Sequence, residues 1–64
     1  MTHIDGLTMD WLTTAWMRAR TTDHSISLLD ESTHLIVTVT AKGGVVIHPD
    51  EQSRDDWLYR KAEW

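Results

Sequence analysis

The sequence predicts an α+β domain of element order α-β-β-β-α, in which a three-stranded antiparallel meander carries two helices packed on one face. The main observation is the stretch over residues 34–48, where β-branched and apolar residues alternate around a Gly-Gly pair. Stretches with apolar residues at helical spacing precede and follow the strands. We expect a single small domain over residues 1–64, with a short lead-in over residues 1–7.

The first helix is predicted over residues 9–20. Thr8 is suited to cap its N-terminus, and Asp10 places a carboxylate in the first turn, where the helix dipole favours negative charge. The residues expected to face the sheet recur every three or four positions: Leu12, Ala15, Trp16 and Ala19.

The three strands are predicted to begin at Ser25, His34 and Val45. A three-residue loop of Lys42-Gly43-Gly44 fits a hairpin with a left-handed glycine. The expected pairs are Val39 with Ile47, Ala41 with Val45, Ile26 with Val37, and Leu28 with Leu35. This register puts one apolar set on the face that both helices should cover: Ile26, Leu28, Leu35, Val37, Val39, Val45 and Ile47.

The second helix has two candidate starts. Pro49-Asp50-Glu51 resembles a first helical turn, whereas Ser53 with Asp56 has the spacing of a capping box. We favour Ser53 as the cap, because the first apolar residues follow it, and we expect a helix over residues 54–63. Trp57, Leu58 and Ala62 should face the sheet.

Composition restricts the classes of function. The formal charge of −4 disfavours direct binding to nucleic acid or anionic membranes, and no apolar run approaches the length of a membrane span. With no basic, apolar leader at the N-terminus either, we expect a soluble cytoplasmic protein. The chain has no cysteine and no phenylalanine, so its four tryptophans are expected to supply most of the aromatic core.

No pattern indicates catalysis, a cofactor or a metal. Glycine-rich phosphate loops, nucleophile elbows and paired metal-binding histidines on a helix are all missing from the sequence, so we expect no enzyme activity and no cofactor. His34 and His48 would share a face of the sheet, but the predicted register separates them by roughly 13 Å, too far to bind one ion. We therefore expect no metal site.

Two surfaces are candidates for binding a partner. The acidic stretch Asp50, Glu51, Asp55 and Asp56 either supports the start of the second helix or docks on a basic groove. The sheet face that the helices leave open is expected to carry Ile36, Thr38, Val46 and His48, either as ordinary exposed residues or as an association surface.

We therefore expect a small acidic module that binds a larger protein or ribonucleoprotein complex. Phage or mobile-element inhibitors of host defence, of the anti-CRISPR or anti-restriction type, have this general character. One alternative is a homodimeric structural or accessory module that associates through the open sheet face. The other is a nucleic-acid-binding module that uses its basic residues: Arg18, Arg20, Arg60 and Lys61.

Overall fold

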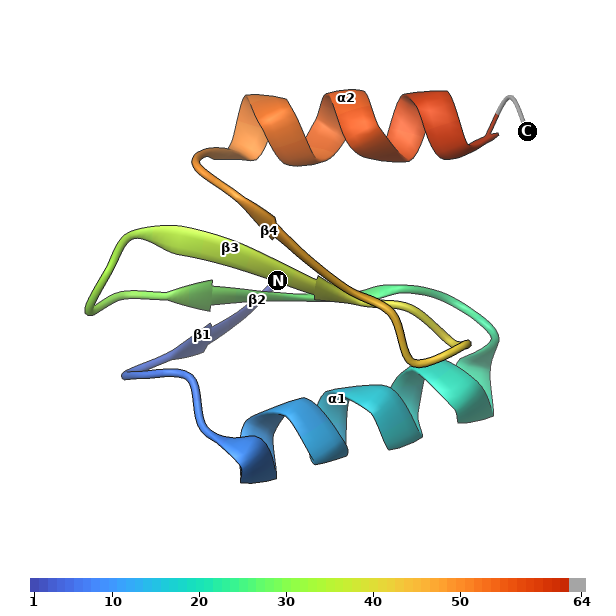
Figure 1. Cartoon of the computed structure of the whole chain (residues 1–64), viewed down its shortest axis with the longest axis horizontal. Helices are drawn as coiled ribbons and strands as arrows, with labels where there is room; N and C mark the ends of the chain where they lie inside the picture. Colours follow the sequence, from blue (N-terminus) through green and yellow to red (C-terminus); the bar gives the residue numbers. More distant parts are fainter. Residues whose placement is uncertain (63–64) are drawn as a thin grey trace.

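The structure, a computed structural model, describes residues 1–62 and contains two helices and one four-stranded mixed sheet (Figure 1). The elements in chain order are β1 (Thr2–Ile4), α1 (Met9–Thr22), β2 (Ile26–Asp30), β3 (Leu35–Val39), β4 (Val45–His48) and α2 (Glu51–Ala62). The α+β class is confirmed. Glu63, the predicted end of the second helix, and Trp64 lie outside the described residues, as does the side chain of Ala62.

The predicted three-stranded antiparallel meander is wrong, because the lead-in forms a fourth strand. The strands lie in the order β1-β2-β3-β4, and β1 runs parallel to β2, with Thr2 opposite Leu28 and Ile4 opposite Asp30. Helix α1 is the crossover that two neighbouring parallel strands require. A strand of three residues is too short to show an alternating pattern, so β1 carries no periodic signal.

The carboxylate of Asp30 holds the end of β1 against the turn after β2. Its Oδ1 accepts hydrogen bonds from the Gly6 N–H at 3.1 Å, the Ser32 N–H at 2.9 Å and the Ser32 hydroxyl at 2.6 Å. The Ser32 hydrogen bonds are the main reason that the pKa of Asp30 lies below its usual value. This network fixes two loops through one side chain.

Helix α1 begins as predicted and ends two residues later than predicted. The Thr8 hydroxyl accepts a hydrogen bond from the Trp11 N–H at 3.2 Å, which confirms the N-cap. At the other end, Asp23 adopts a left-handed conformation with φ of 57°, and its N–H donates to the Ala19 carbonyl. A left-handed residue of this kind is a common way to end a helix.

Both hairpin registers differ from the prediction by two residues. Val39 lies opposite Val45, and Leu28 lies opposite Val37. The β3–β4 loop has three residues and a left-handed glycine as predicted, Gly43 with φ of 90°. It spans residues 41–43 and not 42–44, because the Thr40 N–H donates to the Gly44 carbonyl at 2.8 Å. A shift of two residues keeps every side chain on its face, so the apolar pattern could not choose between the two registers.

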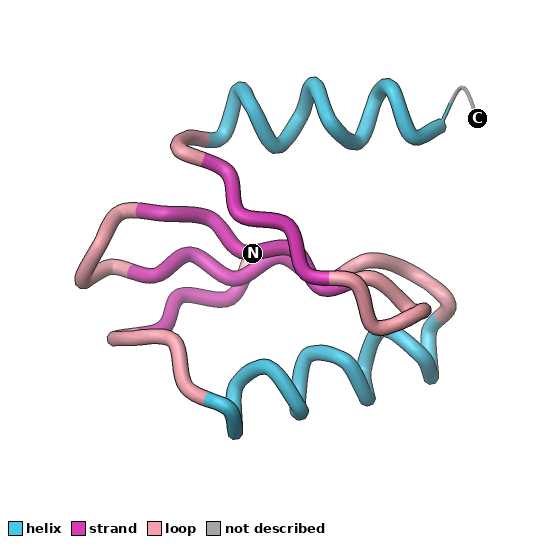
Figure 2. The backbone as a smooth tube through the Cα atoms, viewed as in Figure 1, coloured by secondary structure: helices cyan, strands magenta, loops and turns pink. Residues whose placement is uncertain are grey.

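The two helices lie on opposite faces of the sheet, so the prediction that both cover one face is wrong (Figure 2). Helix α1 contacts β2 and β3, whereas α2 contacts β3 and β4. The core under α1 consists of Ile4, Ala15, Leu28 and Val39, with Leu12 and Ile26 packed against it. The α2 side buries Ile36, Thr38 and His48.

The core of the described residues is aliphatic, and the three described tryptophans contribute less to it than the expected aromatic core implied, whereas Trp64 lies outside those residues. Trp11 and Trp16 are each more than a third exposed, and Trp57 is half-buried. Neither helix of the described chain is long and apolar enough to cross a membrane.

Lysine substitutions on β3 and β4 test the assignment of faces. Ile36→Lys should unfold the domain, because Ile36 is 1% exposed, and burying an unpaired charge costs more than the roughly 5 kcal/mol by which a small domain is stable. Ile47→Lys should be tolerated, because Ile47 is 58% exposed. Circular dichroism and thermal melting of both variants check this. A folded Ile36→Lys protein would contradict the placement of α2.

Candidate functional site

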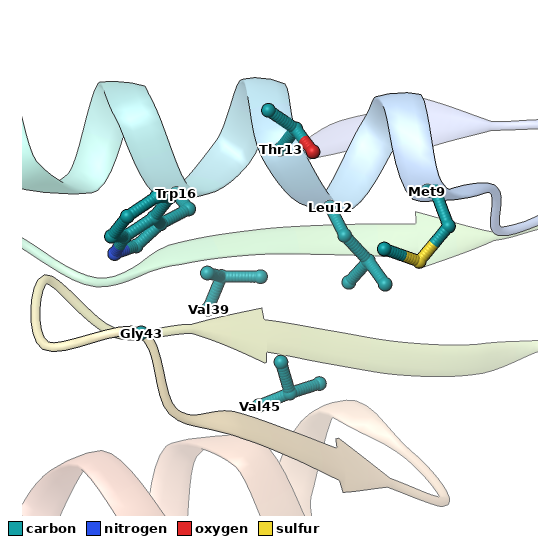
Figure 3. A pocket seen from close by; sticks show the side chains of 7 residues that line it. All are labelled: Met9, Leu12, Thr13, Trp16, Val39, Gly43 and Val45. Atoms are coloured by element: carbon teal, nitrogen blue, oxygen red, sulfur yellow. The ribbon is translucent and has the colours of Figure 1, made fainter.

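The most distinctive surface is an apolar groove between α1 and the end of the sheet that β4 forms, which we call the β4 groove (Figure 3). It has a volume of about 310 Å³. Its lining residues are Met9, Leu12, Thr13, Trp16, Val39, Gly43 and Val45. Met9 and Val45 remain largely exposed in it, with 75% and 49% of their surfaces accessible.

The groove exists because one helix covers only part of the sheet. Helix α1 packs on β2 and β3, so the apolar side chains that β4 directs to the same face have no helix above them. Val45 and Ile47 were predicted to be core residues, yet both are exposed. Their apolar character was readable in the sequence, but their exposure depends on how far α1 extends across the sheet.

Trp16 closes the groove at the β3–β4 turn. A Cβ added to Gly43 would lie 3.4 Å from Nε1 of the Trp16 indole, so the indole already lies close against the turn backbone. The guanidinium of Arg20 lies over the Trp16 ring, 4.8 Å from its centre. The indole is thus held at the end of the groove by contacts from both the turn and its own helix (Figure 3).

The outer edge of β4 offers backbone hydrogen-bonding groups beside the groove. The Thr40–Gly44 hydrogen bond fixes the alternation of the β3–β4 ladder, so Val46 and His48 direct their backbone groups toward β3. Val45 and Ile47 therefore direct their N–H and C=O groups outward. Because β4 is the last strand in the sheet order over the described residues, no further strand of this chain pairs with that edge.

The open sheet face that was predicted to bind a partner is not open. Ile36, Thr38 and His48 are buried beneath α2, and Val46 is half-buried there. The physical reason is that this face also carries apolar residues, and α2 removes them from water. Ile36, Thr38 and His48 therefore form no exposed surface in the folded chain.

His48 is part of the packing under α2. Its Nε2 lies 3.1 Å from the Thr38 hydroxyl, and its ring is 5.5 Å from the Trp57 ring at an angle of 58°. Burial, and secondarily the positive charge of Arg54, lowers the pKa of His48 below its ordinary value of 6.5. The neutral form is therefore the one that fits the fold.

The acidic stretch divides into a cap and an exposed group. Helix α2 begins at Glu51, so the preference for Ser53 as cap is wrong: Asp50 accepts a hydrogen bond from the Ser53 N–H at 2.7 Å. This bond is the main reason that the pKa of Asp50 is lowered. Glu51, Asp55 and Asp56 are exposed, and Arg54 pairs with Asp55 at 2.9 Å.

The basic residues do not form one stripe. Arg18 and Arg20 lie on α1, whereas Arg60 lies on α2, on the opposite face of the sheet. Arg20 is stacked on Trp16, and the side chain of Lys61 lies outside the described part. The basic side chains of the nucleic-acid alternative that the structure describes are therefore carried by both helices and not gathered on one of them.

The histidines lie apart in the structure. His3 is within 2.8 Å of Glu31 at an exposed position, and His34 lies in the β2–β3 turn with φ of 61°. Within residues 1–62, no group of three or more histidine, aspartate or glutamate side chains is placed to hold a metal ion.

Three neutral substitutions separate capping from surface charge. Asp50→Asn should preserve much of the cap, and Asp50→Ala should lower the melting temperature by on the order of 5 °C, because the Ser53 N–H loses its acceptor. Glu51→Gln, one residue later and exposed, should change it little. Thermal melting of the three variants checks this. Equal effects of Asp50→Ala and Glu51→Gln would show that Asp50 is not the cap.

Stability should fall as the pH drops below about 6.5. The unfolded chain takes up a proton at His48 near pH 6.5, whereas the folded chain resists it until a lower pH. The loss should occur between those two pKa values and level off below the folded one. Melting temperatures of the parent, His48→Gln and the control His24→Gln between about pH 7.5 and 5 measure it. An unchanged slope in His48→Gln would contradict this assignment.

Comparisons of the chain with protein-family models, with curated proteins and with solved structures found no match.

Proposed function

We propose that this chain is a protein-binding module that takes an extended segment of a partner as an additional strand on the β4 edge. The observation that carries the proposal is the exposure of Val45 and Ile47 on an edge strand, directly beside an apolar groove. Exposed apolar residues on a free strand edge are normally avoided, because they invite pairing with another chain. Here the edge and the groove form one continuous surface.

Strand addition uses both parts of this surface. The outward N–H and C=O groups of Val45 and Ile47 supply main-chain hydrogen bonds, which give affinity without regard to sequence. The β4 groove receives alternate side chains of the added strand, and this gives specificity. The groove lining is mainly apolar, with Met9 as a flexible wall and Trp16 as a fixed end, so it favours aliphatic or aromatic side chains.

Charge favours a basic partner. The chain carries a net charge of −4, and the exposed carboxylates of Glu51 and Asp56 lie on the helix that follows β4. Surface charges of this kind act mainly on the rate of encounter and on the choice of partner. The acidic stretch therefore steers the approach of a basic partner, while the β4 edge makes the stable contacts.

A module of this kind acts by occupancy. By adding its edge to a larger protein or ribonucleoprotein complex, a chain of 64 residues blocks or bridges a surface of that complex stoichiometrically. We propose that role, inhibitor or adaptor of a larger complex, as the biological setting. We place this protein in the class of small cytoplasmic inhibitors that phages and mobile elements direct at host defence complexes.

Selection of peptides from a random displayed library tests the binding mode. Peptides that bind the parent should alternate apolar and polar residues and should lose at least tenfold in affinity on Ile47→Lys, because the lysine leaves the groove edge charged. Met17→Lys is the matched control. It makes the same kind of change at an apolar residue that is 60% exposed on α1, away from the β4 edge.

The bound peptides should also perturb the amide resonances of Val45 and Ile47 more than those of Val46 and His48, whose N–H groups face β3. Peptides that bind Ile47→Lys and the parent equally well, or a library that yields no binder, would contradict the proposed mode.

A further inference from the structure

We propose that the strand added to the β4 edge is the β4 edge of a second copy of this chain, so that the protein forms a symmetric dimer with a continuous eight-stranded sheet. This inference rests on the proposed strand addition at the β4 edge, and because both use the same edge, the self-paired dimer and the complex with a larger partner exclude each other. Three observations on the β4 edge support it: the alternation of its backbone groups, the position of Pro49, and the opposite charges at its two ends.

Symmetry restricts how two β4 strands can pair. A two-fold axis perpendicular to the sheet makes the two strands antiparallel and keeps the α1 faces of both copies on the same side. The axis passes midway between the two copies of one residue, which therefore lie opposite each other. With Val46 on the axis, Val45 of one copy lies opposite Ile47 of the other. These are the residues whose N–H and C=O groups point outward, so each Val45–Ile47 pair exchanges two hydrogen bonds.

The two neighbouring registers leave some of the outward backbone groups of β4 without hydrogen-bond partners. With Ile47 on the axis, Val45 would lie opposite Pro49, which has no N–H to donate. With Val45 on the axis, Ile47 would lie opposite Gly43, which is inside the turn and has a left-handed backbone. Only the register centred on Val46 satisfies the outward groups of both residues.

The same register buries the exposed apolar residues of the edge. Val45 is 49% exposed and Ile47 is 58% exposed in the single chain, and both lie on the α1 face. Across the axis each Val45 contacts Ile47 of the second copy, and the α1-side apolar layer continues from one copy to the other. Cross-strand aliphatic pairs of this kind stabilise a sheet.

Charge complementarity favours a second copy as the occupant. Antiparallel pairing brings Lys42, in the turn before β4, toward Asp50 and Glu51 at the start of α2 of the second copy, so that the opposite charges make contact. The symmetry makes this contact twice. The edge is therefore basic at one end and acidic at the other, and antiparallel self-pairing brings the opposite charges together.

Within residues 1–62, neither helix is drawn across β4. Figure 1 looks onto the β4 side of the sheet, with β1 drawn fainter behind it, α1 along one face and α2 along the other. An interface limited to one strand and its flanks lies at the small end of protein interfaces, so the dimer should form only at elevated protein concentration.

Analytical ultracentrifugation over about 10 µM to about 1 mM tests the association. The parent should pass from monomer to dimer within this range, and Met17→Lys should behave like it. Ile47→Lys should stay monomeric at every concentration while keeping its circular dichroism. A parent that is monomeric at the highest concentration overturns the dimer but leaves the proposed function standing if selected peptides still bind. If neither dimer formation nor peptide binding is observed, the β4 edge is not a binding surface.

Cysteine substitution tests the register, because the chain has no cysteine of its own. Val46 lies opposite itself as a non-hydrogen-bonded pair, with Cα atoms about 4.5 Å apart, which is within the range of a disulfide. Val46→Cys should therefore oxidise readily to a covalent dimer. Ile47→Cys alone should not, whereas a mixture of Ile47→Cys with Val45→Cys should give the mixed dimer. The reverse pattern overturns this register.

Charge reversal gives an independent readout. Lys42→Glu and Glu51→Lys should each raise the dissociation constant at low salt severalfold, and the double variant should recover the parent value. Glu51 is used in place of Asp50, because Asp50 caps α2. If the double variant is no better than the single ones, the two ends of β4 do not face each other.

Discussion

The sheet of this protein has apolar residues on both faces, and the chain has one helix for each face. Ile36 requires cover on one side, and Leu28 and Val39 require it on the other. This constraint places α1 and α2 on opposite faces, fixes the buried environment of His48, and limits α1 to the strands that it can reach, β2 and β3. The exposed edge at β4 is a direct consequence.

The candidate site is thus the part of the sheet that the helices leave uncovered. Trp16 and Gly43 close one end of the groove, while Met9 borders it and remains accessible. Because the exposed apolar side chains adjoin the outward backbone groups of Val45 and Ile47, the surface suits an extended polypeptide better than a compact ligand. The packing that stabilises the fold and the surface that we propose as a binding site depend on the same layer arrangement.

The acidic residues after β4 have different roles, although they are close together in the sequence. Asp50 stabilises the first turn of α2 through the Ser53 N–H, and Asp55 is paired with Arg54. Glu51 remains available to interact with other molecules. Because Asp50 lies just after the β4 edge strand, the carboxylate that caps α2 also places a negative charge at that end of the edge.

The sequence alone determined the features that depend on neighbouring residues: the α+β class, the Thr8 cap, the extent of α1 to within two residues, and the face of each residue in β2, β3 and β4. Tertiary structure decided the rest. The registers differ from the predicted ones by two residues, and the apolar pattern could not distinguish them because such a shift preserves every face. Strand β1 was not predicted, because three residues are too few to show a period. Val45 and Ile47 were recognisable as apolar, but their exposure depends on where α1 ends across the sheet. That position is set by the packing of the whole domain, which no local pattern records.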